Sequence, residues 1–406
     1  MKQNSNSHSP RVIGLDIHPD SFTAAIVAGP TPVAAYVVKV FNKVPIKQLS
    51  SWAKKHSLSK DILTLEASGN SFHAVRQLAQ IQRQALVLES QFIGKLKEAH
   101  ANNDKISAVR IAKAYLAGTA KTVWVPDTLT QERRDTYHAH QKAVKRSTQL
   151  SNRLKSYLSD QGLRLSSRRS LLNQSEEILK AKDWSPKQRL IIEGLLMEFE
   201  HAQKQRAHWR RLIAQEVLCD PKLLSLTKLT GIRDVVAYAL GALVGDIKRF
   251  ASPKKLVSYV GLYPAFDESG EGGWKGGIRG HGRRDLRSLL IESAQSILRS
   301  NHPLAAWGKR LLARKGSKNI AVAAVARKLV VAVWYVMAGK QSPVEELSPL
   351  MGQKLGKIIT QLGPEGIQSL APTRKELRKQ VIQGLLDGKC YLLDSSKVFA
   401  QEKRTG

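Results

Sequence analysis

The stretch that decides the fold of the first part of the chain runs from Arg11 to Val40 and reads RVIGLDIHPDSFTAAIVAGPTPVAAYVVKV. It holds three apolar runs, RVIGLDIHP, FTAAIVAG and PVAAYVVKV, which short turns separate. Runs of this length that are rich in β-branched residues and bounded by turn residues favour β-strands. We therefore expect three consecutive antiparallel strands.

The following segments alternate between helix and strand. Apolar residues at helical spacing predict a helix near Lys47–His56, a second one through Phe72 and Leu78, and a third over Lys105–Leu116. The runs DILTLEAS and QALVLES are typical of strands, and KTVWVPD predicts a short extended piece. This order is the one expected of an RNase H-like α/β sheet. We expect it to occupy residues 1–126.

Residues 127–219 have a different pattern. Apolar residues recur at Leu150, Leu154 and Tyr157, and again from Leu195 to Val217, with spacings of three and four. This spacing predicts two long amphipathic helices in a helical linker. A Ser-Pro pair at 185–186 suits the start of the second helix. The two helices could form an antiparallel hairpin or a coiled coil that joins subunits.

Residues 220–340 predict a mainly α-helical domain. The segment LTKLTGIRDVVAYALGALVGDI indicates a helix, a tight turn at Thr230-Gly231 and a second helix, a helix-hairpin-helix-like element. Such a turn can direct backbone N–H groups at a phosphate, and an ordinary helical hairpin has the same pattern. A glycine-rich stretch after Tyr263 precedes helices at about Arg284–Ser300 and Ile320–Met337. By itself it fits a flexible loop and a backbone that brings a hydroxyl to a phosphate equally well. Residues 341–406 predict a basic helical extension.

The charge indicates a polyanionic partner. The chain has 65 Lys and Arg against 33 Asp and Glu, a formal net charge of +32. Positive charge is widespread, since residues 1–126 already carry 16 basic and seven acidic side chains. Nucleic acid is favoured over a membrane, because no run of some 18 apolar residues occurs. The polar N-terminus and the two distant cysteines predict a cytoplasmic protein, associated with the nucleoid when it acts.

Three acidic residues are candidates for a metal site. Asp16 lies within a predicted strand, Glu66 ends another, and Asp104 begins a predicted helix. In an RNase H-like sheet the first strand lies beside the fourth, so Asp16 and Glu66 become neighbours, and a packed helix could add Asp104. Converging carboxylates repel each other unless divalent cations such as Mg²⁺ neutralise them. Each acid could instead be an exposed strand-end or helix-cap residue.

The motifs around these residues resemble the transposases of insertion-sequence family 110, which include Piv-type DNA invertases. GLDIHPDSFTAAIV, LEASGNSFHAVRQL and NNDKISAVRIAKAYL resemble its RuvC-like elements and give Asp16, Glu66 and Asp104. LTKLTGIRDVVAYALGALVGDIKRFASPKKLVSYVGLYP, the Ser-Gly pair that starts at Ser269, and RGHGRRDLRSLLIESA resemble its C-terminal serine domain. The resemblance covers roughly residues 11–340.

The resemblance implies a DNA recombinase. Ser269 would attack a DNA phosphodiester through a covalent phosphoserine intermediate, assisted by Mg²⁺ or Mn²⁺ at Asp16, Glu66 and Asp104. Phosphate-binding residues would be Arg279, Arg283, Arg284 and Arg287, with Gly231 and Arg233 in the hairpin turn. The implied partners are double-stranded DNA at the element ends and the target, a noncoding guide RNA, and further subunits in a homodimer or homotetramer.

One position departs from the family pattern. The family's fourth acid should fall three residues after Asp104, where this chain has Ser107. A hydroxyl binds a metal ion weakly, so Ser107 is a doubtful ligand, and Asp20 or Glu89 could substitute for the missing acid. Four functions follow as alternatives. They are a transposase, a site-specific DNA invertase, a RuvC-like nuclease that cuts without rejoining, and a catalytically degenerate nucleic-acid-binding protein.

Overall fold

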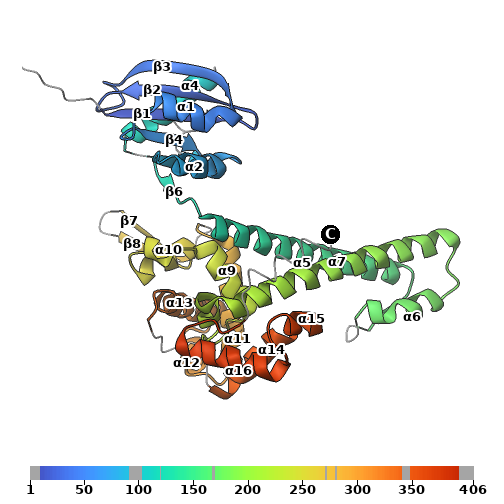
Figure 1. The fold of residues 1–406 in the computed structure, drawn as a ribbon. Helices are drawn as coiled ribbons and strands as arrows, with labels where there is room; N and C mark the ends of the chain where they lie inside the picture. The colour runs from blue at the N-terminus through green and yellow to red at the C-terminus, as the bar shows by residue number, and fades with distance from the viewer. Residues whose placement is uncertain are drawn as a thin grey trace, which may run out of the picture. The chain divides into compact units, whose positions relative to one another are not determined.

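The computed structural model describes residues 10–90, 103–118, 120–166, 170–269, 272–278, 281–340 and 348–392. The chain forms two compact units, Met1–Asp127 and Thr128–Gly406 (Figure 1). The first unit is a mixed α/β sheet domain, and the second is mostly helical.

The first unit is built on a six-stranded sheet with the strand order β3-β2-β1-β4-β5-β6. β1 pairs antiparallel with β2 and parallel with β4, and β5 continues the parallel part. The first strand therefore lies beside the fourth, as the sequence predicts. The strands are β1 (Arg11–Ile17), β2 (Ser21–Ala28), β3 (Tyr36–Pro45), β4 (Ile62–Glu66), β5 (Ala85–Leu88) and β6 (Thr122–Val123).

The third strand begins later than the sequence suggests. Residues 31–34 form a turn, and β3 starts at Tyr36 rather than in the run that begins at Pro32. The Thr31 hydroxyl accepts a hydrogen bond from the backbone N–H of Ala34 at 3.2 Å, which holds the turn closed. A proline also lacks the N–H group that a strand interior needs.

Helices cover both faces of this sheet. α1 (Leu49–His56, after a 3₁₀ turn at Ile46–Gln48) and α2 (Ser71–Gln80) pack with Ile13, Leu15 and Ile17 on one face. α4 (Asp104–Leu116) packs with Val12 on the other. Because side chains alternate along a strand, the even-numbered positions of β1 face α4. Asp16 is one of these positions.

Gly14 allows α4 to lie directly on β1. A Cβ atom at this position would lie 1.9 Å from the carbonyl oxygen of Ala108 and 2.8 Å from the backbone nitrogen of Ala112. Only a residue without a side chain tolerates such backbone contact. Gly14 therefore sets the distance between the helix and the strand that carry the acidic residues.

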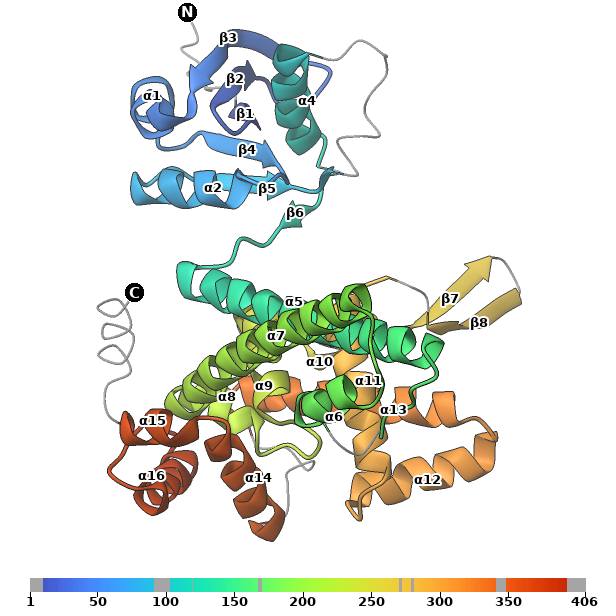
Figure 2. The same ribbon diagram turned by 90° about the vertical axis from the view of Figure 1, so that its right-hand side faces the viewer.

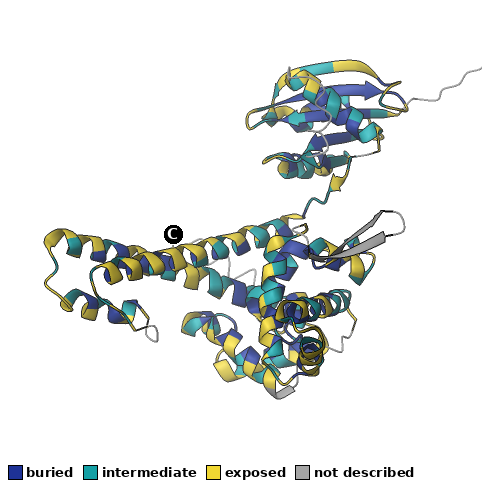
Figure 3. Ribbon diagram, turned by 180° about the vertical axis from the view of Figure 1, so that it is seen from behind, coloured by how far each residue is buried: buried dark blue, intermediate teal, exposed yellow. Residues whose placement is uncertain are grey.

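The second unit begins with two long helices, α5 (Thr128–Asp160) and α7 (Pro186–Cys219), which lie side by side (Figures 1 and 2). Leu154 near the end of α5 packs with Ile192 near the start of α7, whereas Arg133 near the start of α5 pairs with Glu216 near the end of α7. The helices are thus an antiparallel hairpin, the first of the two predicted arrangements. Its meeting faces are buried and its outer faces are exposed (Figure 3).

The start of α7 follows the predicted capping pattern. The Ser185 hydroxyl accepts a hydrogen bond from the N–H of Gln188, whose side chain accepts one from the N–H of Ser185. This reciprocal pair is a capping box, with Pro186 in the first turn. A short 3₁₀ turn (Leu172–Gln174) and α6 (Ser175–Lys180), which the sequence pattern did not reveal, lie between the long helices.

A helical core follows the hairpin. α8 (Pro221–Leu226) and α9 (Asp234–Val244) flank the predicted turn at Gly231, whose φ is 75°. α13 (Lys318–Met337) is long and apolar enough to cross a membrane, but half of it is buried inside the fold, as the sequence predicts for a core helix. The other helices of this core are α10 (Pro253–Val260), α11 (Arg284–Leu298) and α12 (Pro303–Lys315).

The glycine-rich stretch contains a β-hairpin rather than only a loop. β7 (Pro264–Ser269) pairs antiparallel with β8 (Gly272–Ile278), and Ser269 is the register partner of Gly272. The stretch lacks the β-branched residues that identify strands, so its backbone pairing leaves no pattern to recognise.

Residues 348–392 form a helical region. α14 (Ser348–Thr360), α15 (Gly363–Gln368) and α16 (Arg374–Asp387) share a core with the end of α7 and with α8. Lys354 is 8% exposed, and its amine donates hydrogen bonds to the carbonyl oxygens of Thr227 and Leu229, at 2.8 and 2.9 Å. This contact attaches the extension to the turn before α9.

Candidate functional site

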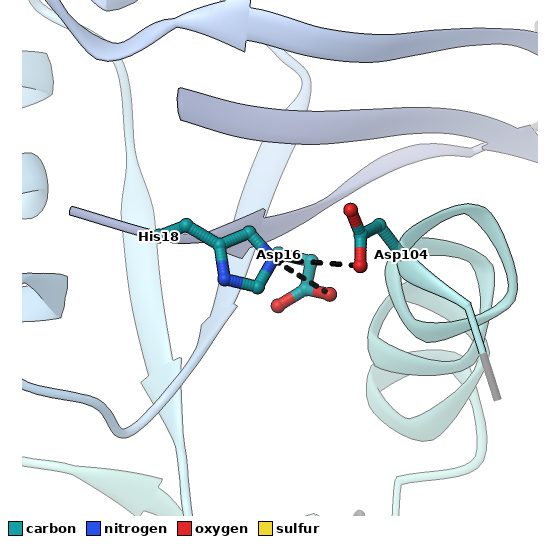
Figure 4. A group of neighbouring side chains, drawn as sticks. All are labelled: Asp16, His18 and Asp104. Carbon is teal, nitrogen blue, oxygen red and sulfur yellow. Dashed lines mark ion pairs between the residues drawn. The ribbon is translucent and has the colours of Figure 1, made fainter. Parts of the chain in front are cut away.

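Three side chains on the α4 face of the first unit form a cluster that could hold a metal ion. Nε2 of His18 lies 3.7 Å from Oδ2 of Asp16 and 3.6 Å from Oδ1 of Asp104 (Figure 4). The ligand atoms of the three residues lie within 4.8 Å of one another. Asp16 and Asp104, both predicted site residues, are thus brought together by the packing of α4 on β1.

Each member of the cluster has a defined position. Asp16 lies near the end of β1 and His18 directly follows the strand, two residues later, so their side chains lie on the same side (Figure 4). Asp104 is the first residue of α4, and the side chain of Asn103 caps that helix by accepting a hydrogen bond from the N–H of Ile106 at 2.9 Å. A carboxylate in the first turn of a helix is stabilised by the helix dipole.

The electrostatics of Asp16 reflect a partly buried carboxylate. Burial raises its pKa above the ordinary value, and the nearby Asp104 raises it further. His18 lowers this pKa, as does a hydrogen bond from Ser107. Ser107 therefore lies in the cluster, one helical turn after Asp104, and its hydroxyl partly compensates the charge of Asp16.

The cluster passes a simple test for a cation site. Nε2 of His18 is buried and has no hydrogen-bond partner in the described part of the chain, although two carboxylates lie less than 4 Å away. Buried polar nitrogen atoms are almost always satisfied. Two carboxylate oxygens and one imidazole nitrogen at this spacing are donors that suit a divalent cation with water completing its coordination.

Three other acids lie outside the cluster. Glu66 ends β4, the strand next to β1, but it joins no group of three potential ligands within 4.8 Å among the described residues. The same holds for Asp20, which is exposed in the turn after β1, and for Glu89, which follows β5. The strand pairing thus places Glu66 at the neighbouring strand end without bringing its carboxylate into contact with all the others.

His18 is the residue of this site that the sequence reasoning missed. It follows Asp16 in the pattern Asp-Ile-His, and the period of two along a strand already places both side chains on one face. This spacing was the available signal.

Ser269 lies at the end of β7, beyond a firmly fixed hairpin base. A Cβ atom on Gly261 would lie 2.1 Å from the carbonyl oxygen of His281, and one on Gly282 would lie 2.6 Å from the backbone nitrogen of Gly261. Both glycines have positive φ, 79° and 88°. The chain entering β7 and the chain entering α11 therefore pack backbone against backbone.

The predicted arginines have different environments. Arg283 forms a two-pronged ion pair with Asp285 at 3.1 and 2.7 Å, and Arg287 donates hydrogen bonds to the carbonyl oxygens of Gly261 and His281. Arg287 therefore helps to fix the hairpin base, whereas Arg283 pairs within its own segment. Arg284 is exposed at the start of α11, and Arg279 lies outside the described residues.

The turn before α9 carries a buried carboxylate. Asp234, the first residue of α9, is 0% exposed and pairs with Arg210 at 2.8 Å. Arg233 lies 4.0 Å from the same side chain and is itself 46% exposed. Negative charge from the protein thus already occupies the helix start next to Gly231, where the sequence suggested a phosphate.

Comparison with known proteins shows similarity to transposases. Residues 224–307 match the family described as Transposase IS116/IS110/IS902 family. The chain is 22% identical over 311 residues to the transposase for insertion sequence element IS1111A of Coxiella burnetii, covering 75% of this chain and 85% of that protein. This share exceeds the second unit, so the similarity extends into the first.

Two further relatives agree with this. The chain is 23% identical over 285 residues to a Pseudomonas aeruginosa protein named as a probable family 20 transposase, covering 68% of this chain and 84% of that protein. It is 22% identical over 280 residues to the transposase for insertion sequence element IS1328 of Yersinia enterocolitica, covering 68% and 83% of the two chains.

Proposed function

We propose that this chain, whose residues 224–307 match the IS116/IS110/IS902 family of transposases, is the transposase of an insertion sequence. The observation that carries the proposal is similarity to such transposases over up to 75% of the chain and most of each relative. The formal net charge of +32 suits a protein that binds DNA along much of its surface. The substrates are double-stranded element ends and target DNA.

In the proposed reaction, the Oγ atom of Ser269 attacks a DNA phosphodiester. A bond forms between this oxygen and phosphorus, the bond to one sugar oxygen breaks, and that oxygen leaves as a hydroxyl after it takes up a proton. A hydroxyl of the second DNA then attacks the phosphoserine, which rejoins the strands and restores Ser269. The covalent intermediate conserves the bond energy, so no cofactor has to supply it.

The acidic cluster of the first unit supplies the cation site in this proposal. Asp16, His18 and Asp104 would hold Mg²⁺ or Mn²⁺, and Ser107 would orient Asp16 rather than act as a ligand. When bound, such a cation supplies positive charge that stabilises the attacking and the leaving oxygen. The strand order of the first unit supports its assignment as an RNase H-like, RuvC-like domain, in which Glu66 lies at the adjacent strand end.

The guide RNA and the subunit number belong to the same proposal. Widely distributed positive charge supports the binding of a noncoding RNA in addition to DNA. Base pairing would then choose the site, and the protein would contact mainly the phosphate backbone. Bringing two DNA sites together requires a homodimer or homotetramer.

A second candidate function is a metal-dependent nuclease that cuts without rejoining. The observation that favours it is the cluster itself, because its three ligand side chains all come from the first unit and need nothing from Ser269. The two functions differ in what the serine does. A nuclease keeps its cutting activity in Ser269→Ala, whereas the transposase loses strand transfer.

A transposition assay in cells tests the proposal. A plasmid that carries the element with its native ends, including the noncoding region, is supplied with the full chain, and new junctions in target DNA are counted. We expect junctions with the wild type and with Ser258→Ala, an exposed serine on α10, and none with Ser269→Ala or Asp16→Asn. Wild-type protein that yields no junctions, or Ser269→Ala that yields as many as the wild type, would overturn the assignment.

A further inference from the structure

A cavity in the second unit has no role in the proposed strand transfer. Its volume is about 520 Å³, and side chains from α5, α7, α9 and α11 line it. These helices come from distant parts of the sequence, which gather around the base of the long hairpin (Figure 2). Cavities of this size hold ligands of roughly nucleotide dimensions.

Two polar side chains on the α5 wall are buried. Tyr137 is 2% exposed and lines the cavity. His140, 4% exposed, has a buried Nδ1 that has no partner among the described residues. Buried polar atoms are normally satisfied, so the unpaired Nδ1 of His140 is an unusual feature of this wall.

The rest of the wall combines apolar surface with hydrogen-bonding groups of both kinds. Val144 and Leu289 contribute the apolar surface. The Gln141 amide can both donate and accept hydrogen bonds, and the Glu292 carboxylate accepts them. A flat heterocycle with donors and acceptors along one edge matches this combination, whereas a bare anion would meet the carboxylate and an acyl chain would leave the polar groups unpaired.

A free cation stands at the edge of the cavity. Arg206 lines it, is exposed, and forms no ion pair within the residues that the structure describes. Arg210, one helical turn further along α7, is different because Asp234 holds it at 2.8 Å. Arg206 is therefore the guanidinium available to a phosphate that enters with the heterocycle.

We infer that this cavity binds one unpaired nucleotide of the nucleic-acid substrate, with its base between Leu289 and the α5 wall and its phosphate at Arg206. The inference rests on the proposed function insofar as it takes nucleic acid to be the partner. Extruding a base from a duplex costs a few kcal/mol, and this cost is smallest for a base that is already unpaired. The cavity thus selects bulges and single-stranded junctions, in DNA or in RNA.

Binding to matched duplexes tests the inference. The full chain is titrated with three end-labelled DNA duplexes, one fully paired, one with a single-nucleotide bulge, and one with an abasic bulge, and the fluorescence anisotropy is followed. The same three probes made of RNA form a second arm, which shows whether the unpaired nucleotide comes from DNA or from RNA. We expect the bulged probe to bind about tenfold more tightly than the paired one, and the abasic bulge to lose this gain.

Two variants tie the gain to the cavity. Leu289→Trp fills it and Gln141→Ala removes its amide, and both should abolish the tenfold difference while paired DNA binds as before. Gln141→Ala decides the matter if Leu289→Trp does not fold. Leu190→Trp, on an exposed position of α7 far along the hairpin, is the matched control and should keep the difference.

The outcomes separate this inference from the proposed function. Equal binding of bulged and paired probes in both arms, equal binding of the base-containing and abasic bulges, or a gain that survives Gln141→Ala overturns the cavity as a nucleotide site. None of these results contradicts the proposed function as a transposase. Failure of the chain to bind paired DNA at all would instead count against the proposed function.

Discussion

At the scale of single residues, the meeting of Asp16, His18 and Asp104 is the most informative feature of the first unit. Two carboxylates close to each other raise the free energy of the fold unless a positive group lies between them. The imidazole of His18 lies within 4 Å of both carboxylates, at 3.6 and 3.7 Å, which is too far for good hydrogen bonds. The arrangement favours an ion in the space that the three side chains share.

Replacing His18 tests that role. In His18→Asn the imidazole ligand is lost, and we expect the affinity for Mn²⁺ to fall at least about tenfold. Even the loss of a group that only hydrogen-bonds to a metal ligand lowers metal affinity by that factor. Isothermal titration of the full chain with Mn²⁺ measures it. His73→Asn, an exposed histidine on α2, is the matched control and should bind as the wild type does. Equal affinities for all three proteins would contradict the assignment of His18 as a ligand.

The periodicity of strands and helices predicts where a residue lies along its own element, but not how far its side chain lies from those of other elements. This limited what the sequence could predict about the site. Asp16 within a strand and Asp104 at a helix start were recognisable from local patterns. Ser107 was noticed only as a departure, whereas the structure gives it a hydrogen bond to Asp16. Whether Glu66 would reach the others depends on side-chain distances across two strands, which no local pattern contains.

At the scale of elements, the close contact of α4 with β1 creates the cluster. We expect Gly14→Ala to lower the free energy of unfolding by about 1–3 kcal/mol, because the new methyl group would overlap the backbone of Ala108. The helix must shift away, so the Mn²⁺ affinity should fall as well. Gly69→Ala is the matched control, since its new methyl group would meet nothing within 4 Å. Urea unfolding and Mn²⁺ titration give both readings, and unchanged values for Gly14→Ala would refute this account of the packing.

The packing of α5 against α7 predicts a pH dependence of stability. Burial, together with Arg210 and Arg206, lowers the pKa of His140 from 6.5 to about 4. The unfolded chain therefore binds more protons than the folded chain between these values, and stability falls as the pH drops through this window. In the wild type, His140 should contribute up to about 1.4 kcal/mol per pH unit to the change of the free energy of unfolding with pH. We expect His140→Gln to lack this contribution.

Urea unfolding between pH 4.5 and 7 measures that slope. His138→Gln, an exposed neighbour on the same helix, should keep the slope of the wild type. A slope that is the same in His140→Gln and in the wild type would show that His140 titrates normally.

The elements themselves were predictable where amphipathic spacing is regular. The long helices, the helix start at Ser185-Pro186 and the strand neighbours β1 and β4 all followed from sequence patterns. The hairpin β7–β8 did not, because its glycines carry no side-chain pattern. The cavity between α5, α7, α9 and α11 was also beyond reach, since it arises only when four distant segments pack together.

At the scale of the whole molecule, each unit has its own core, and the C-terminal extension is part of the second. We expect Lys354→Leu to lower the free energy of unfolding by about 2 kcal/mol or more, because the carbonyl oxygens of Thr227 and Leu229 lose their buried donor. Lys357→Leu changes an exposed lysine one turn further on and should have little effect. Urea unfolding compares the two, and an equal effect of both changes would show that the Lys354 amine does not fasten the extension.

The central claim is that Ser269 joins covalently to DNA. The most direct measurement is to incubate the full chain with Mg²⁺, its noncoding RNA and labelled element-end DNA, stop the reaction with denaturant, and look for label that migrates with the protein. The account predicts a denaturant-resistant adduct with the wild type and with Ser258→Ala, and none with Ser269→Ala. No adduct with the wild type, or an adduct that persists in Ser269→Ala, would contradict it.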